Sequence, residues 1–166
     1  MRIAVISDIH DNLANLEKFL GWCGKEKIAW LICLGDITNA ETLEALARFP
    51  GEIDLVAGNG EIYDAIELAR HPRIRYHGLI GAAAVDGQKI GFCHEPYLID
   101  EILRKESDLD FVFYGHTHKP WEIIDKNRPR PRIINPGTLG GVFQKATFAV
   151  YCPTEDGIEL KILELL

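Results

Sequence analysis

The sequence of 166 residues has no long apolar run, few cysteines and no excess of basic residues. Its longest apolar stretches, such as residues 28–35, are far too short to cross a membrane. A strand-like run begins at Ile3 and reaches Asp8 quickly, so we expect no signal peptide. The scattered cysteines form no C-x-x-C pair, so we expect a cytoplasmic protein without a disulfide framework. They are Cys23, Cys33, Cys93 and Cys152.

Acidic residues outnumber basic ones by 25 to 18, which gives a formal net charge of -7. This balance argues against a broad surface for nucleic acid or anionic membrane, so neither is an expected partner. One basic stretch, interrupted by prolines, is the exception. We interpret it as a solvated hairpin loop that protects a sheet edge, in preference to a rim that attracts phosphates. It comprises Lys126, Arg128, Arg130 and Arg132.

Apolar strand-like runs alternate with helical patterns three times in the first half of the chain, which indicates parallel βαβ units. Asn12 can cap the first helix, Thr38 or Asn39 can cap the second, and the third is shorter. The predicted strands are residues 2–7, 29–34 and 53–57, and the helical patterns run through residues 13–20, 43–47 and 62–68.

The second half of the chain contains mostly strand-like runs, with one helical pattern at residues 99–103. Asp86-Gly87 is typical of a hairpin turn. We therefore predict an α/β fold in a single domain over residues 1–166: a four-layer α-β-β-α sandwich of two mixed β-sheets flanked by helices. The predicted strands are residues 79–85, 89–93, 111–114, 121–125, 132–135, 146–152 and 158–163.

Side chains that can bind metals follow five of the predicted strands, where open α/β sheets keep their ligand sites. Oxygen and imidazole donors without a thiolate suit Mn, Fe, Co, Ni or Zn. Seven donors exceed what one tetrahedral metal uses, but they suit two metals that share one carboxylate, as in phosphatases and nucleases. They are Asp8, His10, Asp36, Asn59, His94, His116 and His118.

Each donor also has a simpler interpretation. Asp8 and Asp36 could cap helices, Asn59 could be a turn residue, and His94 could lie in an exposed loop. These interpretations would have to hold together at five strand ends, so we favour the metal site.

Four other residues are not predicted to be ligands. Cys93 neighbours His94 on a strand and should point to the opposite face. His71 and His77 match no pattern and are predicted to be ordinary surface residues. Asn135 is expected to support the site through hydrogen bonds.

The order of the donor blocks carries a family resemblance. The sequence resembles the calcineurin-like metallophosphoesterase superfamily, whose pattern is D-x-H, G-D, G-N-H-[D/E], a later His and G-H-x-H. A later turn resembles the N-P-G-S turn of the small prokaryotic branch of that superfamily. The matching blocks here are Asp8-Ile9-His10, Gly35-Asp36, Gly58-Asn59-Gly60-Glu61, His94, Gly115-His116-Thr117-His118 and, for the turn, Asn135-Pro136-Gly137-Thr138.

The resemblance implies a phosphodiesterase with two divalent metal ions, of which Mn is most expected and Ni, Fe, Co or Zn are alternatives. A hydroxide between the metals would attack phosphorus in line. The implied ligands of the first metal are Asp8, His10, Asp36 and His118. The implied ligands of the second metal, which form the catalytic set, are Asp36, Asn59, His94 and His116.

Two departures from the family pattern bear on the substrate. Gly60 stands in place of a histidine, which removes a candidate general acid. Glu95 stands where the small branch often has a glycine. Together with Glu61, its expected position near the metals would weaken attraction for doubly charged groups. We therefore expect better turnover of activated phosphodiesters than of simple alkyl monoesters.

Other functions remain open at this point. The retromer subunit of vacuolar sorting resembles this branch in fold and serves as a non-catalytic interaction scaffold. A phosphomonoesterase or a nuclease could use the same site, although a nuclease would need a basic groove. Terminal hairpins could also pair in a homo-oligomer, but nothing in the sequence requires it.

Overall fold

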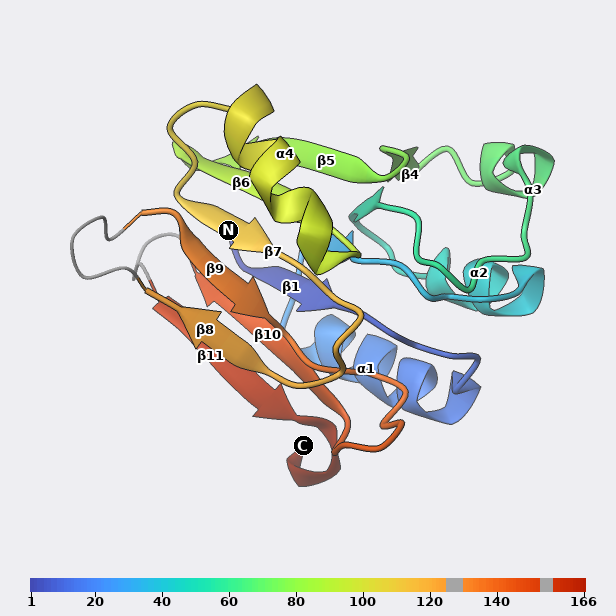
Figure 1. Ribbon diagram of the computed structural model, residues 1–166. Coiled ribbons are helices and arrows are strands. Elements are labelled where there is room, and N and C mark those ends of the chain that lie inside the picture. The colour runs from blue at the N-terminus through green and yellow to red at the C-terminus, as the bar shows by residue number, and fades with distance from the viewer. Residues whose placement is uncertain (125–129, 153–156) are drawn as a thin grey trace.

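The computed structural model describes residues 1–124, 130–152 and 157–166 (Figure 1). Within these ranges, no helix has both the length and the apolar character that crossing a bilayer demands. The four-layer α-β-β-α sandwich predicted from the sequence is confirmed: two mixed sheets lie face to face, with helices on the outer faces.

The first sheet has six strands in the order β11-β10-β1-β2-β3-β4. Strands β1 to β4 are parallel neighbours, which the βαβ pattern predicted for the first three of them, and β10 joins β1 in antiparallel fashion. No sequence pattern predicts β4, because its three residues include two exposed ones and no apolar run marks them. The strands are β1 (Ile3–Ile6), β2 (Trp30–Cys33), β3 (Glu52–Leu55), β4 (Ile74–Tyr76), β10 (Thr147–Cys152) and β11 (Gly157–Ile162).

The second sheet has five strands in the order β5-β6-β7-β9-β8. Strands β6, β7 and β9 are parallel, whereas β5 and β8 close the two edges in antiparallel fashion. The predicted hairpin between β5 and β6 turns at Asp86-Gly87, where both residues have positive φ. The strands are β5 (Ile80–Val85), β6 (Gln88–Cys93), β7 (Phe111–Phe113), β8 (Trp121–Ile123) and β9 (Arg132–Asn135).

Helices cover the outer face of each sheet. Leu16 and Phe19 of one helix and Leu43 of the next pack on the first sheet, and Ile102 packs on the second, where Figure 1 shows α4 lying across β6 and β7. A third apolar cluster fills the space between the sheets. The helices are α1 (Leu13–Lys25), α2 (Ala40–Leu46), α3 (Ala65–Ala69) and α4 (Ile99–Lys105), with short 3-10 turns at η1 (Pro96–Leu98) and η3 (Leu163–Leu165).

Polar side chains set where the first three helices begin. Asn12 caps α1 and Asn39 caps α2, each by accepting a hydrogen bond from a backbone N–H three residues on. The third helix begins later than its apolar pattern suggested. Asp64 and Glu67 form a capping box that starts α3, so Ile62 precedes the helix.

The basic stretch falls partly outside the described residues, since Lys126 and Arg128 lie there. Arg130 donates to Gln88 and forms an ion pair with Asp110. Arg132 likewise pairs with Glu122 on the neighbouring strand. Acidic or polar partners therefore accompany the two arginines that the structure describes.

Candidate metal centre

The carboxyl ends of the parallel strands in both sheets meet at one end of the sandwich. Figure 1 shows the connections that follow β1, β7 and β9 at this end. The structure brings all seven predicted donors into this region through a continuous set of contacts. None of the predicted donors lies apart from the others.

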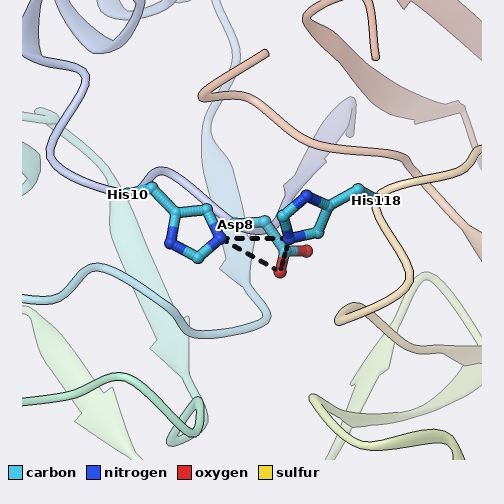
Figure 2. A group of neighbouring side chains, drawn as sticks. All are labelled: Asp8, His10 and His118. Atoms are coloured by element: carbon cyan, nitrogen blue, oxygen red, sulfur yellow. Dashed lines mark hydrogen bonds and ion pairs between the residues drawn. The ribbon is translucent and has the colours of Figure 1, made fainter. Parts of the chain in front are cut away.

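The first group of donors joins residues that are more than a hundred positions apart in the chain. His118 Nε2 lies 3.1 Å from Asp8 Oδ1 and 3.0 Å from His10 Nε2. Figure 2 shows both imidazole rings turned toward the Asp8 carboxylate. Three donor atoms thus converge on one small volume, as a shared cation requires.

Asp36 lies between the two groups of histidines. Its Oδ2 is 3.6 Å from His10 Nε2 on one side and 3.5 Å from His94 Nε2 on the other. Its other oxygen, Oδ1, accepts hydrogen bonds from the backbone N–H groups of Asn59 and Gly60. One carboxylate oxygen is therefore anchored, and the second faces histidines of both groups.

Backbone carbonyls select the tautomers of two histidines. Nδ1 of His94 lies 2.7 Å from the carbonyl oxygen of Leu34, and Nδ1 of His118 lies 3.2 Å from that of Val142. Because a carbonyl oxygen can only accept, each Nδ1 carries the proton. Each Nε2 is then left with the lone pair that a metal binds.

The amide of Asn59 completes the second group. Its Oδ1 lies 3.2 Å from His94 Nε2, so two lone pairs face each other in this orientation. The reverse amide orientation would instead place its nitrogen near His94 and the Asp36 carboxylate. A cation between the acceptors would favour the first orientation, because it removes the repulsion between lone pairs.

His116 stands at the outer side of this group. Its ring makes an edge contact with His94, with centroids 5.4 Å apart, and its Nδ1 lies 3.6 Å from Glu95 Oε1. Cys93 packs in the apolar cluster beneath α4, on the side of the strand opposite His94, as predicted.

Backbone strain concentrates at this site. Five of the seven predicted donors have positive φ, between 46° and 66°, although none of them is glycine. A side chain in this left-handed region costs on the order of 1 kcal/mol or more, and the cost is tolerated most often at functional sites. The five are Asp8, His10, Asp36, His116 and His118.

Two glycines allow the loops to approach closely. A Cβ on Gly58 would collide with Asp36, and one on Gly115 would collide with Ser7 while lying 3.2 Å from Asp8 Oδ2. Gly60 differs from both, because a Cβ there would meet Asp36 atoms only at ordinary distances of 3.5–3.9 Å. The position that lacks the family histidine therefore has room for a side chain.

The donor set fits divalent cations by its chemistry and by one unsatisfied atom. Asp8 is fully buried, and its Oδ1 has no hydrogen-bond partner. Burial raises the pKa of the Asp8 carboxyl above its usual value. A buried carboxylate oxygen without a donor is costly unless a cation completes it.

The contacts of Glu61 are not predicted by any pattern in the sequence. Its carboxylate accepts hydrogen bonds from the backbone N–H groups of Gly58, at 2.9 Å, and Thr38, at 3.0 Å. Gly58 directly precedes Asn59, and Thr38 lies two residues after Asp36. The Glu61 side chain therefore connects the two loops that carry these donors. The prediction that Glu61 would act as a negative charge at the metals overlooked these amide partners.

The predicted role of Asn135 as a support is confirmed by its hydrogen bonds. Its Nδ2 donates to the carbonyl of Gly115 and to Thr117, and its Oδ1 accepts from Gly137. The prediction that His77 is an ordinary surface residue is wrong. Its ring lies 2.6 Å from the buried carboxylate of Asp54.

Comparison with known proteins identifies the family. Residues 1–156 match the calcineurin-like phosphoesterase superfamily domain. The chain belongs to this superfamily. The resemblance that the donor blocks suggested is thus confirmed over most of the chain.

Relatives in the superfamily carry two kinds of name. Phosphodiesterase MJ0936 of Methanocaldococcus jannaschii is 27% identical over 148 residues, which are 85% of this chain and 86% of that protein. Vacuolar protein sorting-associated protein 29 of Schizosaccharomyces pombe is 29% identical over 129 residues, 72% of this chain and 63% of that protein. This chain thus spans less than two thirds of the yeast protein.

A solved structure described as a novel archaeal phosphodiesterase shares the fold. It superposes with a TM-score of 0.84 at 21% identity and covers 98% of this chain and 99% of its own. At this level of identity the likeness concerns the fold alone.

Proposed function

We propose that the chain is a dinuclear-metal phosphodiesterase that hydrolyses small phosphate diesters. The observation that carries this proposal is the position of Asp36 Oδ2, which lies within 3.6 Å of a histidine nitrogen on either side. A carboxylate shared between two sets of donors is what a two-metal phosphoesterase site needs.

The seven donors divide around this carboxylate. When bound, two divalent ions activate water as the nucleophile and offset charge on the phosphoryl oxygens. Mn is our first candidate, with Ni, Fe, Co or Zn as alternatives, because the donors are oxygen and imidazole. One ion would be held by Asp8, His10, Asp36 and His118, and the other by Asp36, Asn59, His94 and His116.

The loops around the donors orient the site for this chemistry. Proton donation from Nδ1 to backbone carbonyls holds His94 and His118 with Nε2 toward the centre. Glu61 and Asn135 brace the loops that carry the other donors. Bound cations would also supply the positive charge for a substrate phosphate that the acidic chain itself lacks.

The substrate preference follows from the missing general acid. Gly60 carries no side chain that could protonate a leaving group, and such a group typically contributes about 10²–10⁴ in rate. Aryl diesters, whose leaving groups need little protonation, are therefore preferred over alkyl monoesters. A higher kcat/KM on an alkyl phosphomonoester than on an aryl phosphodiester would contradict this preference.

The testing experiment is hydrolysis of bis-p-nitrophenyl phosphate after loading with Mn²⁺, Ni²⁺ or Zn²⁺. Wild type is compared with Asp36→Asn and His116→Ala. We expect activity in wild type and its loss in both variants. Equal rates in all three proteins with every metal would refute the proposal of an enzyme and favour a non-catalytic function.

The second candidate is an interaction scaffold without catalysis. It is favoured by the similarity to the yeast protein named for vacuolar protein sorting. The complete set of seven donors argues for the enzyme, because a scaffold needs no strained, convergent ligand loops.

A further inference from the structure

An exposed aromatic ring lies next to the first group of donors. Phe143 is 93% exposed, and its φ of 60° places a bulky side chain in the left-handed region. It directly follows Val142, whose carbonyl oxygen contacts His118. The ring therefore contributes almost no hydrophobic stabilisation to the fold, and its backbone conformation is energetically unfavourable.

The loop that carries Phe143 is pinned to the ligand loop that follows β1. The N–H of Leu139 donates to the carbonyl of Ser7 at 2.8 Å, and the N–H of Gly140 donates to that of Asp8 at 2.9 Å. These hydrogen bonds hold the loop, and with it the backbone of Phe143, in a defined position relative to the donors.

A second exposed ring lies next to the other group of donors. Tyr97 is 73% exposed and lies two residues after Glu95, whose carboxylate is 3.6 Å from His116. Its neighbour Leu98 is buried, and the N–H of Leu98 donates to the carbonyl of Glu95 at 3.0 Å. The short turn η1 is thus anchored while the tyrosine ring faces water.

Each group of donors is therefore in contact with a segment that carries an exposed aromatic residue. Exposed aromatic rings on anchored loops are suited to stacking on planar groups, and every nucleobase has such a face. A phosphodiester has an organic arm on either side of its phosphate. The net charge of -7 disfavours long polyanions, which leaves small molecules as the better match.

We propose that Phe143 and Tyr97 flank the bound phosphate and determine specificity by stacking, and that the substrate is a small phosphodiester of a nucleoside. This inference rests on the proposed function, since the phosphate is held by the metal centre. Its new content is the substrate class and the two residues that select it.

The test compares two diesters with the same leaving group. Thymidine 5′-(p-nitrophenyl) phosphate carries a nucleoside arm, and methyl p-nitrophenyl phosphate carries a methyl group in its place. In the double variant Phe143→Ala/Tyr97→Ala, we expect kcat/KM for the thymidine diester to fall about 5- to 150-fold, mainly through KM, with no change for the methyl diester. The pair Phe143→Tyr and Tyr97→Phe should retain wild-type values.

A matched control removes an exposed apolar side chain elsewhere. Leu165 on η3 is 77% exposed, and Leu165→Ala should leave both diesters unaffected. An equal fall for both diesters in the double variant would mean that the loops only position ligands, and it would overturn the inference. An unchanged ratio accompanied by an altered oligomeric state would overturn it as well, because the rings would then serve contacts between copies.

Calorimetry separates this inference from the proposed function. Binding of thymidine 5′-monophosphate to the metal-loaded protein should weaken in the double variant by the same factor as the loss in kcat/KM. Equal affinity in wild type and double variant would refute stacking even in an active enzyme. If wild type hydrolyses neither diester, the proposed function fails, and the calorimetric comparison still decides whether the rings bind a nucleoside.

Discussion

Two buried carboxylates in this protein have opposite surroundings. Asp54, on β3 and 1% exposed, accepts hydrogen bonds from Trp30, from the guanidinium of Arg75 and from the ring of His77. Asp8, at the end of β1, is equally buried, yet one of its oxygens has no hydrogen-bond partner.

The pKa values of the two carboxyl groups are shifted in opposite directions. Burial alone would raise the pKa of Asp54, but hydrogen bonds from His77 and Arg75 outweigh it and hold the pKa below its usual value. Burial dominates at Asp8 and raises its pKa. A buried carboxylate whose oxygens accept hydrogen bonds stabilises the fold. A buried carboxylate oxygen without a hydrogen-bond partner marks a candidate ligand-binding site.

The largest effect is expected at Asp36, which both donor groups share. Asp36→Asn should weaken both metals and lower kcat on an aryl diester by about 10²–10³, the loss typical of removing one preorganised electrostatic group. Calorimetric metal titration and the diester assay measure the two effects. Asp54→Asn is the matched control and should keep both metals. Loss of only one metal in Asp36→Asn would show that the carboxylate is not shared.

The next effect is expected from Glu61, which braces the loops but is not among the seven donors. Glu61→Gln should weaken metal affinity about 10- to 100-fold, as for other residues that orient ligands, because a neutral amide accepts more weakly from two backbone N–H groups. Glu164, an acidic residue of η3, supplies the control Glu164→Gln. Unchanged metal affinity in Glu61→Gln would limit this residue to a role in folding.

A smaller effect tests the satisfied carboxylate directly. Asp54→Ala should lower the free energy of unfolding by about 1–3 kcal/mol, because it leaves Trp30 and His77 without their acceptor while the half-exposed Arg75 regains water. Urea denaturation measures the change.

Asp8→Asn should instead raise the free energy of unfolding of the metal-free protein. The variant should also lose the stabilisation that added metal gives wild type. A destabilised metal-free Asp8→Asn would contradict the contrast.

The smallest effects concern the acid range. The folded-state pKa of Asp54 lies below the unfolded value of about 3.9, so its stabilisation is full above that value and is lost as pH falls through the folded pKa. Asp8 has a raised pKa, so metal-free protein loses stability as pH rises through it. From acid to neutral pH, the urea midpoint of Asp54→Asn should therefore fall relative to that of wild type. The urea midpoint of metal-free Asp8→Asn should rise relative to that of wild type over the same range. Parallel pH profiles would refute this pairing.

Much of the architecture could be predicted from local sequence. Apolar runs and helix caps such as Asn12 and Asn39 depend on neighbouring residues alone, so they located most strands and the first two helices. Strand β4 was missed because its pairing with β3, not its own composition, makes it a strand. The capping box of Asp64 likewise overrode the apolar pattern that had suggested an earlier start for α3.

The candidate ligands and their order after the strands can be read from the sequence alone. Which buried carboxylates find hydrogen-bond donors depends on how distant segments pack against one another. Asp54 and His77 look unremarkable in the sequence, but their contact makes one a buried anion and the other its partner. The contacts of Glu61 with backbone amides of other loop residues likewise depend on the packing of the loops. Hydrogen bonds between distant segments depend on three-dimensional proximity, which no local pattern encodes.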